Sequence, residues 1–205
     1  MNIALDLIGS VIIAGFVIMI GVTLNGTVMG NADASKAELS VQESMVDIVR
    51  TLEYDFRKIG FGVPENQHAI LDTGATYIKF QADIVDADGD PFPDGILDVI
   101  EWKLGPLETG MPNPRVRTLF RRVNYGAWVG ASLGVTDFKL KYLNQDGQPP
   151  VSIGAIYIIE TTLQVESPYK VQDQVITDQT WDKMGYATAF WRQTRLASRN
   201  IKRHG

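Results

Sequence analysis

The chain has 205 residues, of which 45% are hydrophobic and 21% are charged, and its net charge is −5. This balance is typical of a folded protein and not of a disordered one, and the acidic charge argues against general nucleic-acid binding, which needs a basic surface. Because the chain has no cysteine, disulfides, thiolate catalysis and cysteine-ligated zinc are excluded.

The first predicted element is an apolar helix over residues 1–24. Residues 7–24 read LIGSVIIAGFVIMIGVTL and carry no charge, and Asp6 stands just ahead of them. Eighteen such residues are enough to cross a bilayer as a helix at about 1.5 Å per residue. A cleavable signal peptide ending near 32–34 is the alternative. It is disfavoured because no lysine or arginine precedes Lys36 and because the apolar run is longer than such peptides usually have.

A break and then a second helix are predicted next. Residues 25–34 contain several glycines and asparagines, which are poor mid-helix residues. Ser35 and Glu38 then form a capping-box pattern that favours a new helix start. The apolar positions that follow are spaced by three or four residues, which predicts one buried helical stripe. These positions are Val41, Met45, Ile48, Leu52, Phe56 and Ile59.

The remainder of the chain predicts an antiparallel sheet. Several segments alternate and are rich in β-branched and aromatic residues. The predicted strands are 76–85, 96–104, 116–125, 135–143, 153–165 and, as an edge strand or irregular tail, 186–200. Strands after one long helix favour an α+β fold with an antiparallel sheet. The predicted organisation is a stem over 1–60, made of an apolar half (1–24), a break (25–34) and an amphipathic half (35–60), and a globular β domain over 61–205.

An acidic cluster lies between two of the predicted strands. Seven acids and no base occur from Asp83 to Glu101. The four central ones are Asp86, Asp88, Asp90 and Asp94. Carboxylates spaced in this way can wrap a loop around Ca²⁺, which takes six to eight oxygen ligands. The segment is not an EF-hand, because a proline stands at the sixth loop position. A hairpin turn in which Asp and Gly serve the backbone is the alternative interpretation.

The sequence does not predict an enzyme. The two histidines, His68 and His204, have no nucleophile or carboxylate at a meaningful spacing. The chain also lacks the common phosphate-binding, dinucleotide-binding and hydrolase motifs. Apart from Ca²⁺, no cofactor is expected.

Taken in order, these elements resemble the type IV pilin-like proteins, and most closely the minor pilin and pseudopilin branch with prepilin-type N-terminal cleavage and methylation. The segments that carry the resemblance are 52–62 (LEYDFRKIGFG), the acidic DxDGD loop followed by 100–104 (IEWKL), 118–122 (TLFRR), 135–147 (VTDFKLKYLNQDG) and Arg199-Asn200. Each motif is short, and their shared order over nearly the whole chain makes the likeness.

The resemblance implies a structural subunit of a type IV pilus-like or pseudopilus helical filament that assembles through the apolar helix. The implied assembly residues are Met1, Asp6, Leu7, Ile12, Ile13, Phe16, Ile18 and Ile20. Asp6 takes the place of the family's glutamate at the fifth position once Met1 is removed. In a filament its carboxylate is expected to pair with the α-amine of a neighbouring subunit.

The resemblance also implies partners and a location. The expected partners are further copies of the chain, other pilin-like subunits and the inner-membrane assembly machinery, with no nucleic acid. Residues 3–24 are expected in the membrane before assembly, and the filament would be extracellular or periplasm-spanning. The alternative function is a membrane-anchored extracytoplasmic binding domain that does not polymerise. Asp6 favours the filament, because an acid costs up to about 3 kcal/mol toward the bilayer centre and gives a simple anchor nothing.

Overall fold

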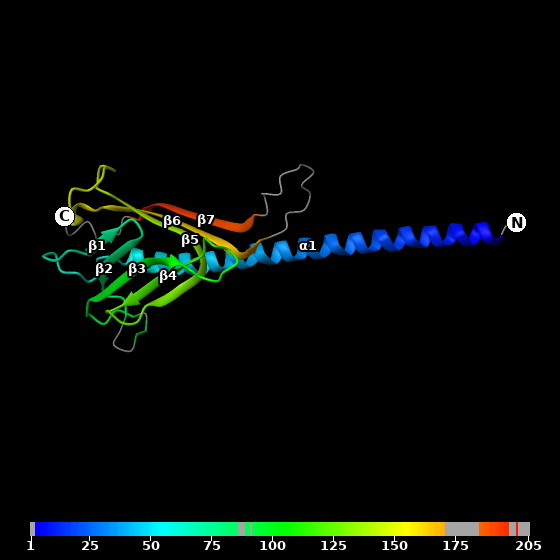
Figure 1. Ribbon diagram of the computed structural model, residues 1–205. Coiled ribbons are helices and arrows are strands. Elements are labelled where there is room, and N and C mark those ends of the chain that lie inside the picture. The colour runs from blue at the N-terminus through cyan, green and yellow to red at the C-terminus, as the bar shows by residue number, and fades with distance from the viewer. Residues whose placement is uncertain (1–2, 86–88, 91, 171–184, 197–199, 201–205) are drawn as a thin grey trace.

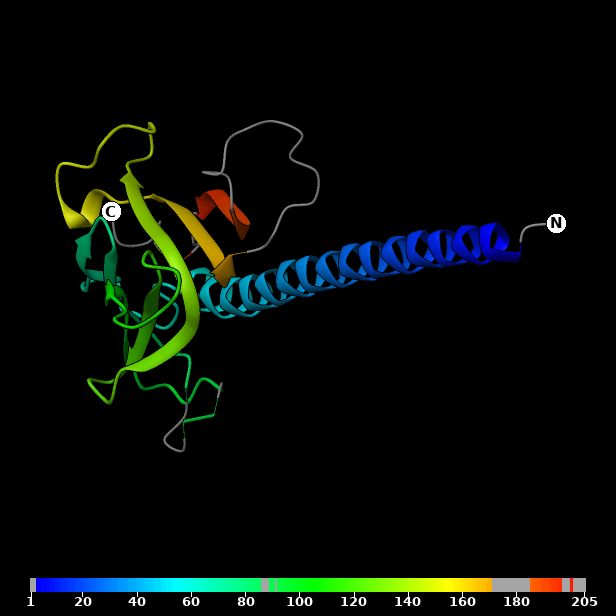
Figure 2. The ribbon, with the colours of Figure 1, turned by 45° about the vertical axis from the view of Figure 1, so that its right-hand side comes forward.

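The structure is a computed structural model that describes residues 3–85, 89–90, 92–170, 185–196 and 200. One long helix, α1 (Ile3–Arg57), is followed by a sheet domain. The strands are β1 (Ile70–Gly74), β2 (Tyr77–Ala82), β3 (Asp98–Leu107), β4 (Arg117–Val123), β5 (Val129–Leu143), β6 (Ile158–Lys170) and β7 (Tyr186–Leu196), with a short 3-10 helix η1 (Ile153–Ala155). Figure 1 and Figure 2 show α1 extending far beyond the sheet, with the N-terminus at its outer end.

The seven strands form one sheet in chain order, β1 to β7, and every neighbouring pair is antiparallel. The predicted α+β fold with an antiparallel sheet is therefore confirmed. The last predicted strand, 186–200, is β7 at one edge of the sheet. At the other edge lies β1, which was not predicted because its five residues, ILDTG, carry little alternation. The start predicted at 153 for the fifth segment, which corresponds to β6, is early, since residues 153–155 form η1.

The predicted break over 25–34 is wrong, because α1 is continuous from Ile3 to Arg57. The predicted helix start at Ser35 is wrong for the same reason. Each glycine in this stretch costs about 1 kcal/mol relative to alanine. Starting a second helix would require a new and costly nucleation. The stretch contains no proline, and the first proline of the chain is Pro64. The helix that forms on either side therefore continues through the weak helix-forming residues of this stretch.

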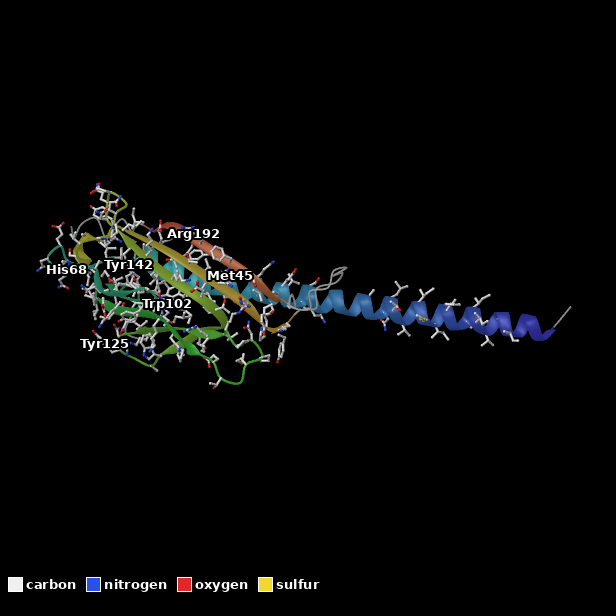
Figure 3. All side chains as sticks on the ribbon, turned by 45° about the horizontal axis from the view of Figure 1, so that its top comes forward. Met45, His68, Trp102, Tyr125, Tyr142 and Arg192 are labelled. Atoms are coloured by element: carbon white, nitrogen blue, oxygen red, sulfur yellow. The ribbon has the colours of Figure 1, made fainter. Side chains whose placement is uncertain are left out.

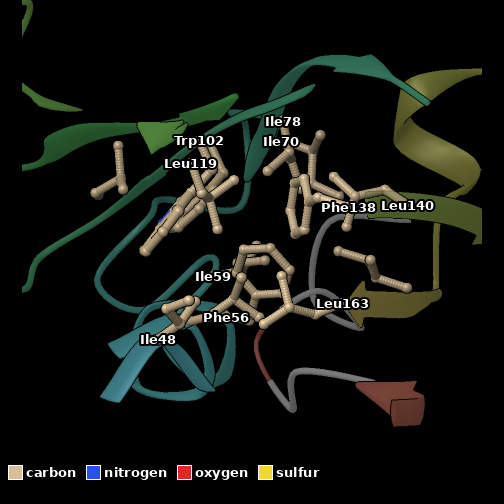
Figure 4. Close-up of a cluster of buried hydrophobic side chains, with 14 of the residues drawn as sticks. Ile48, Phe56, Ile59, Ile70, Ile78, Trp102, Leu119, Phe138, Leu140 and Leu163 are labelled. Carbon is tan, nitrogen blue, oxygen red and sulfur yellow. The ribbon is translucent and has the colours of Figure 1, made fainter. Parts of the chain in front are cut away.

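The buried stripe predicted for the second half of the helix is confirmed. All six of its apolar residues lie in the hydrophobic core with strands β1 to β6. Figure 4 shows Ile48 and Phe56 of α1, together with Ile59 in the turn that follows it, facing Trp102 and Leu119 of the sheet. Phe56 also meets Phe80 edge to face, with ring centroids 6.0 Å apart. Each such side chain contributes about 1.5–3 kcal/mol when it is fully buried, so this stripe is the main attachment of the helix to the sheet.

After α1 the chain turns through two glycines with left-handed backbone, Gly60 and Gly62. Gly60 has φ +79°, and a Cβ placed there would lie 2.9 Å from the Cβ of Ala69. The Gly60 amide donates to the Gln81 carbonyl at 3.0 Å, and the Asp83 amide donates to the Phe61 carbonyl at 2.9 Å. Glycine is needed at Gly60 because an L side chain meets both strain and a clash. These two hydrogen bonds attach the turn after α1 to the end of β2, although β1 comes next in the chain.

Candidate functional site

The N-terminal half of α1 is an apolar surface without cover. Among the described side chains of the helix, none before Val41 is buried. The large apolar side chains from Ile8 to Val28 are between 52% and 69% exposed, on all sides of the helix. Residues Ile8–Asn25 form a helical stretch long and apolar enough to cross a membrane. Since water does not favour such a surface, this half of the helix needs lipid or protein around it.

The predicted assembly residues are distributed around this surface and not gathered at one point. Ile12, Ile13, Phe16, Ile18 and Ile20 are all exposed. Asp6 and Leu7 lie in the first turns of α1, but their side chains are outside the described part of the chain. Met1 is outside the described residues altogether. The predicted roles of Asp6 and Met1 therefore stay predictions.

Small residues leave room for close approach along this half of the helix. A Cβ added at Gly9, Gly15 or Gly21 would meet nothing within 4 Å. The hydroxyl of Thr23 donates to the Met19 carbonyl at 2.9 Å, so this polar group is satisfied within the helix. A helix whose polar groups bond internally and whose surface has glycine gaps suits an apolar environment shared with other helices.

Two apolar residues extend the exposed surface beyond the apolar half. Leu39 and Val46 are 59% and 53% exposed, and their spacing of seven residues places both on one side of the helix. The core stripe that begins at Val41 occupies a different side. Neither residue was predicted from the sequence as part of a contact surface, although their heptad spacing on an otherwise polar face was a usable signal.

A buried ion pair ties the stem to the sheet. Asp55 of α1 is fully buried and accepts hydrogen bonds from Arg121 Nε at 2.7 Å and Arg121 Nη2 at 3.0 Å. The Trp102 Nε1 group donates to the same carboxylate at 2.7 Å. Three donors from β3 and β4 thus converge on one helix residue. This arrangement orients the stem on the sheet, because a charged bidentate pair accepts only a narrow range of geometries.

A pocket of about 500 Å³ lies beside this pair, between α1 and the connection from β4 to β5. Asp47, Ile48 and Thr51 line it from the helix, and Arg121 and Val129 line it from the sheet side. Its lining combines apolar side chains with the charged Asp47, Arg121 and Arg122. It is a groove at the foot of the stem.

The acidic segment acts in large part as a backbone-binding turn. The buried Asp83 carboxylate accepts the amides of Asp94 and Gly95 at 2.9 and 3.0 Å. The buried Asp98 carboxylate accepts the amides of Ile84 and Val85, both at 3.0 Å. These contacts fit the turn interpretation, in which aspartates satisfy backbone donors.

The predicted calcium ligands are only partly described. Asp86 and Asp88 lie outside the described residues. The Asp94 carboxylate accepts the Ile96 amide at 2.8 Å, and Asp90 is exposed. In the described part of the chain, no group of three or more histidine, aspartate or glutamate side chains is placed to hold a metal ion. Calcium binding here stays a prediction.

Glu101 is the centre of a polar cluster on the sheet face opposite α1. Its carboxylate accepts Arg122 Nε at 2.7 Å, Arg122 Nη2 at 2.9 Å and the Tyr77 hydroxyl at 2.8 Å. Burial alone would raise the pKa of Glu101, but the hydrogen bonds from Arg122 and Tyr77 outweigh it and hold that pKa below its ordinary value. Burial and the hydrogen bond to Glu101 raise the pKa of the Tyr77 hydroxyl. Both groups therefore keep their usual charge states near neutral pH.

Comparisons of the chain with protein-family models, with curated proteins and with solved structures find no match.

Proposed function

We propose that this protein is a structural subunit of a helical filament of the type IV pilus or pseudopilus kind, and that it assembles through α1. The observation that carries the proposal is the length of helix that projects beyond the sheet, which is apolar over Ile8–Asn25. From Ile3 to Ser40 the helix extends about 57 Å beyond its first buried residue, at 1.5 Å per residue. A hydrocarbon core is about 30 Å thick, so a bilayer covers only about half of this length.

The segment of α1 between its apolar half and the sheet best distinguishes a filament stem from a simple membrane anchor. Residues 26–40 are helical but include glycines and asparagine, which form isolated helices poorly in water. A membrane anchor could use any flexible linker here. A continuous helix is instead what a stem needs when neighbouring stems pack along its whole length.

Leu39 and Val46 support the same conclusion. In a solitary anchored domain both side chains would lie in water above the membrane. In a bundle of stems they would be covered by neighbouring helices, and each would contribute about 1.5–3 kcal/mol on full burial. Asp6, in the first turns of α1, is proposed to pair with the α-amine of an adjacent subunit and to set the axial register. The membrane and the assembly machinery are the proposed partners before polymerisation.

Single-cysteine labelling tests this proposal, because the chain has no cysteine of its own. Leu39→Cys and Val46→Cys would be labelled with a water-soluble maleimide in cell envelopes and in detergent-solubilised monomers. We expect strong protection in envelopes and fast reaction in detergent. Gln148→Cys, at an exposed loop position, is the control and should react equally in both. If Leu39→Cys and Val46→Cys also react equally in both, the protein is a non-polymerising anchored domain and the proposal fails.

A further inference from the structure

The sheet face opposite α1 carries a cluster of cations and aromatic rings, which we name the cation–aromatic face. Its members are Lys79, Lys103, Phe120, Arg122, Tyr125 and Trp128. The strand register places Lys79 opposite Glu101, Glu101 opposite Arg122, and Lys103 opposite Phe120. These side chains therefore share one face of β2, β3 and β4, which are adjacent strands about 4.8 Å apart. Tyr125 and Trp128 come from the connection between β4 and β5.

The cations and rings alternate in space. Lys79 Nζ lies 4.7 Å from the Tyr125 ring centroid, and Arg122 Cζ lies 5.8 Å from the same centroid. Around Trp128, Lys103 Nζ lies at 3.8 Å and Arg122 Cζ at 4.3 Å. Cations at these distances are attracted by the ring faces. The rings thus hold three positive charges at fixed places on the surface.

These charges are only partly neutralised. Arg122 pairs with Glu101, but within the described residues neither Lys79 nor Lys103 has a carboxylate within 4.0 Å. Asp72 lies across from Lys79 in the strand register without forming an ion pair with it. With Glu101 and Asp72 set against the three cations, the face keeps a net charge of about +1 on a chain whose net charge is −5, and it is complementary to an anion.

Tyr125 is held on this face in an unfavourable backbone conformation. Asn124 and Tyr125 have φ +50° and +59°, and the Gly126 amide donates to the Val123 carbonyl at 2.9 Å. This is the geometry of a turn whose second central position favours glycine, and a bulky residue there is an outlier. The Tyr125 side chain is nevertheless 59% exposed. Figure 3 shows it at the rim of the sheet domain.

From these observations we infer that the cation–aromatic face binds an extended acidic polysaccharide. A sugar ring would lay its C–H groups on the exposed surface of Tyr125, since the ring face is negative. Its carboxylates would pair with Lys79 and Lys103. The face is a sheet surface and not an enclosed pocket, which suits a polymer better than a small molecule. This inference does not depend on filament assembly.

A carboxylated saccharide fits better than nucleic acid. The affinity of a protein for a polynucleotide comes mainly from the number of phosphates that its cations neutralise. The three cations of this face are partly offset by Glu101 and can neutralise only a few phosphates. Single-stranded nucleic acid also stacks successive bases on several open rings, whereas Tyr125 is exposed and the Phe120 and Trp128 rings of this face are only half-exposed. A run of acidic side chains alone, as in polyglutamate, has no ring to place against Tyr125.

The test uses the full chain in detergent and four immobilised polymers. Polygalacturonate carries a carboxylate on each ring, its methyl ester keeps the rings without the charge, polyglutamate keeps the charge without the rings, and oligo-dT is a nucleic acid. We expect binding to polygalacturonate at least tenfold tighter than to the other three. Equal binding to any of the others, or no binding to polygalacturonate, overturns the inference.

Variants then locate the site. Tyr125→Gly should weaken binding at least tenfold without a large fall in Tm, because glycine relieves the positive φ. Tyr125→Phe should keep binding, and Lys103→Gln should weaken it. Lys139→Gln, an exposed lysine on β5, is the matched control and should bind as the wild type does. If Tyr125→Gly and Lys103→Gln both bind as tightly as the control, the polymer binds elsewhere and the inference is wrong.

Discussion

Replacing Asp55 with alanine should strongly destabilise the attachment of the stem to the sheet. The Asp55 side chain is fully buried, whereas the side chain of its partner Arg121 is 25% exposed. Removing one partner of a buried ion pair typically costs about 3–5 kcal/mol. Because Arg121 can regain some water, we expect the lower end, about 3 kcal/mol, with part of it arising from the Trp102 Nε1 donor left unsatisfied.

This free energy corresponds to a measurable fall in Tm. For a chain of this size each kcal/mol shifts Tm by about 2–4 °C, so Asp55→Ala should unfold about 6–12 °C below the wild type. Thermal unfolding of the full chain can be followed by near-ultraviolet circular dichroism, which reports on the packing of the aromatic side chains, the buried Trp102 among them. Glu43→Ala, an exposed acid on the same helix, is the control and should change Tm by less than about 2 °C.

A double-mutant cycle tests the mechanism. Arg121→Met removes the opposite charge, and the pair Asp55→Ala with Arg121→Met should be less destabilised than the sum of the two single variants. A coupling of about 1–3 kcal/mol is expected for groups in direct contact. The reasoning is refuted if Asp55→Ala lowers Tm no more than Glu43→Ala does, or if the two single effects simply add.

Three further predictions address the sheet face, the stem and the acidic loop. The pKa of Glu101 is lowered in the folded state, so its contribution to stability is present above about pH 4.5 and is lost as pH falls through the folded pKa. The Tm difference between wild type and Glu101→Gln should therefore shrink between about pH 5 and pH 2. A Tm difference that stays constant over this range would contradict the prediction. Asp6→Ala should leave the sheet domain folded, as judged by an unchanged Tm, yet abolish or misregister filament assembly, and normal filaments would count against the proposed pairing. If residues 86–94 bind Ca²⁺, a chelator should lower the Tm of protein prepared with calcium, and an unchanged Tm would remove that idea.

The parts of the fold that were predictable are those with a clear local period. The spacing of Ile48, Leu52 and Phe56 fixes one helical face whatever the partner is, and alternation marks the longer strands. The break over 25–34 could not be judged in the same way, because helix continuity depends on cooperativity with flanking segments and not on the residues of the stretch alone. The short strand β1 has too few residues to establish a period.

The contacts that organise the candidate sites are long-range and were not predictable. Asp55 meets Arg121 across 66 positions of sequence, and nothing local distinguishes that aspartate from an exposed one except its place beside the apolar stripe. The cation–aromatic face likewise depends on the register of three strands and on a turn that holds Tyr125 at positive φ. Local patterns specify elements, whereas such pairings are set only when the sheet is assembled.

We propose that α1 is a stem that packs against other copies of itself, and electron microscopy of the purified full chain as detergent is removed tests this most directly. We expect filaments of uniform diameter, in which the stems form the centre and the sheet domains form the surface. Monodisperse particles with no filaments, under every condition of detergent removal, would contradict it.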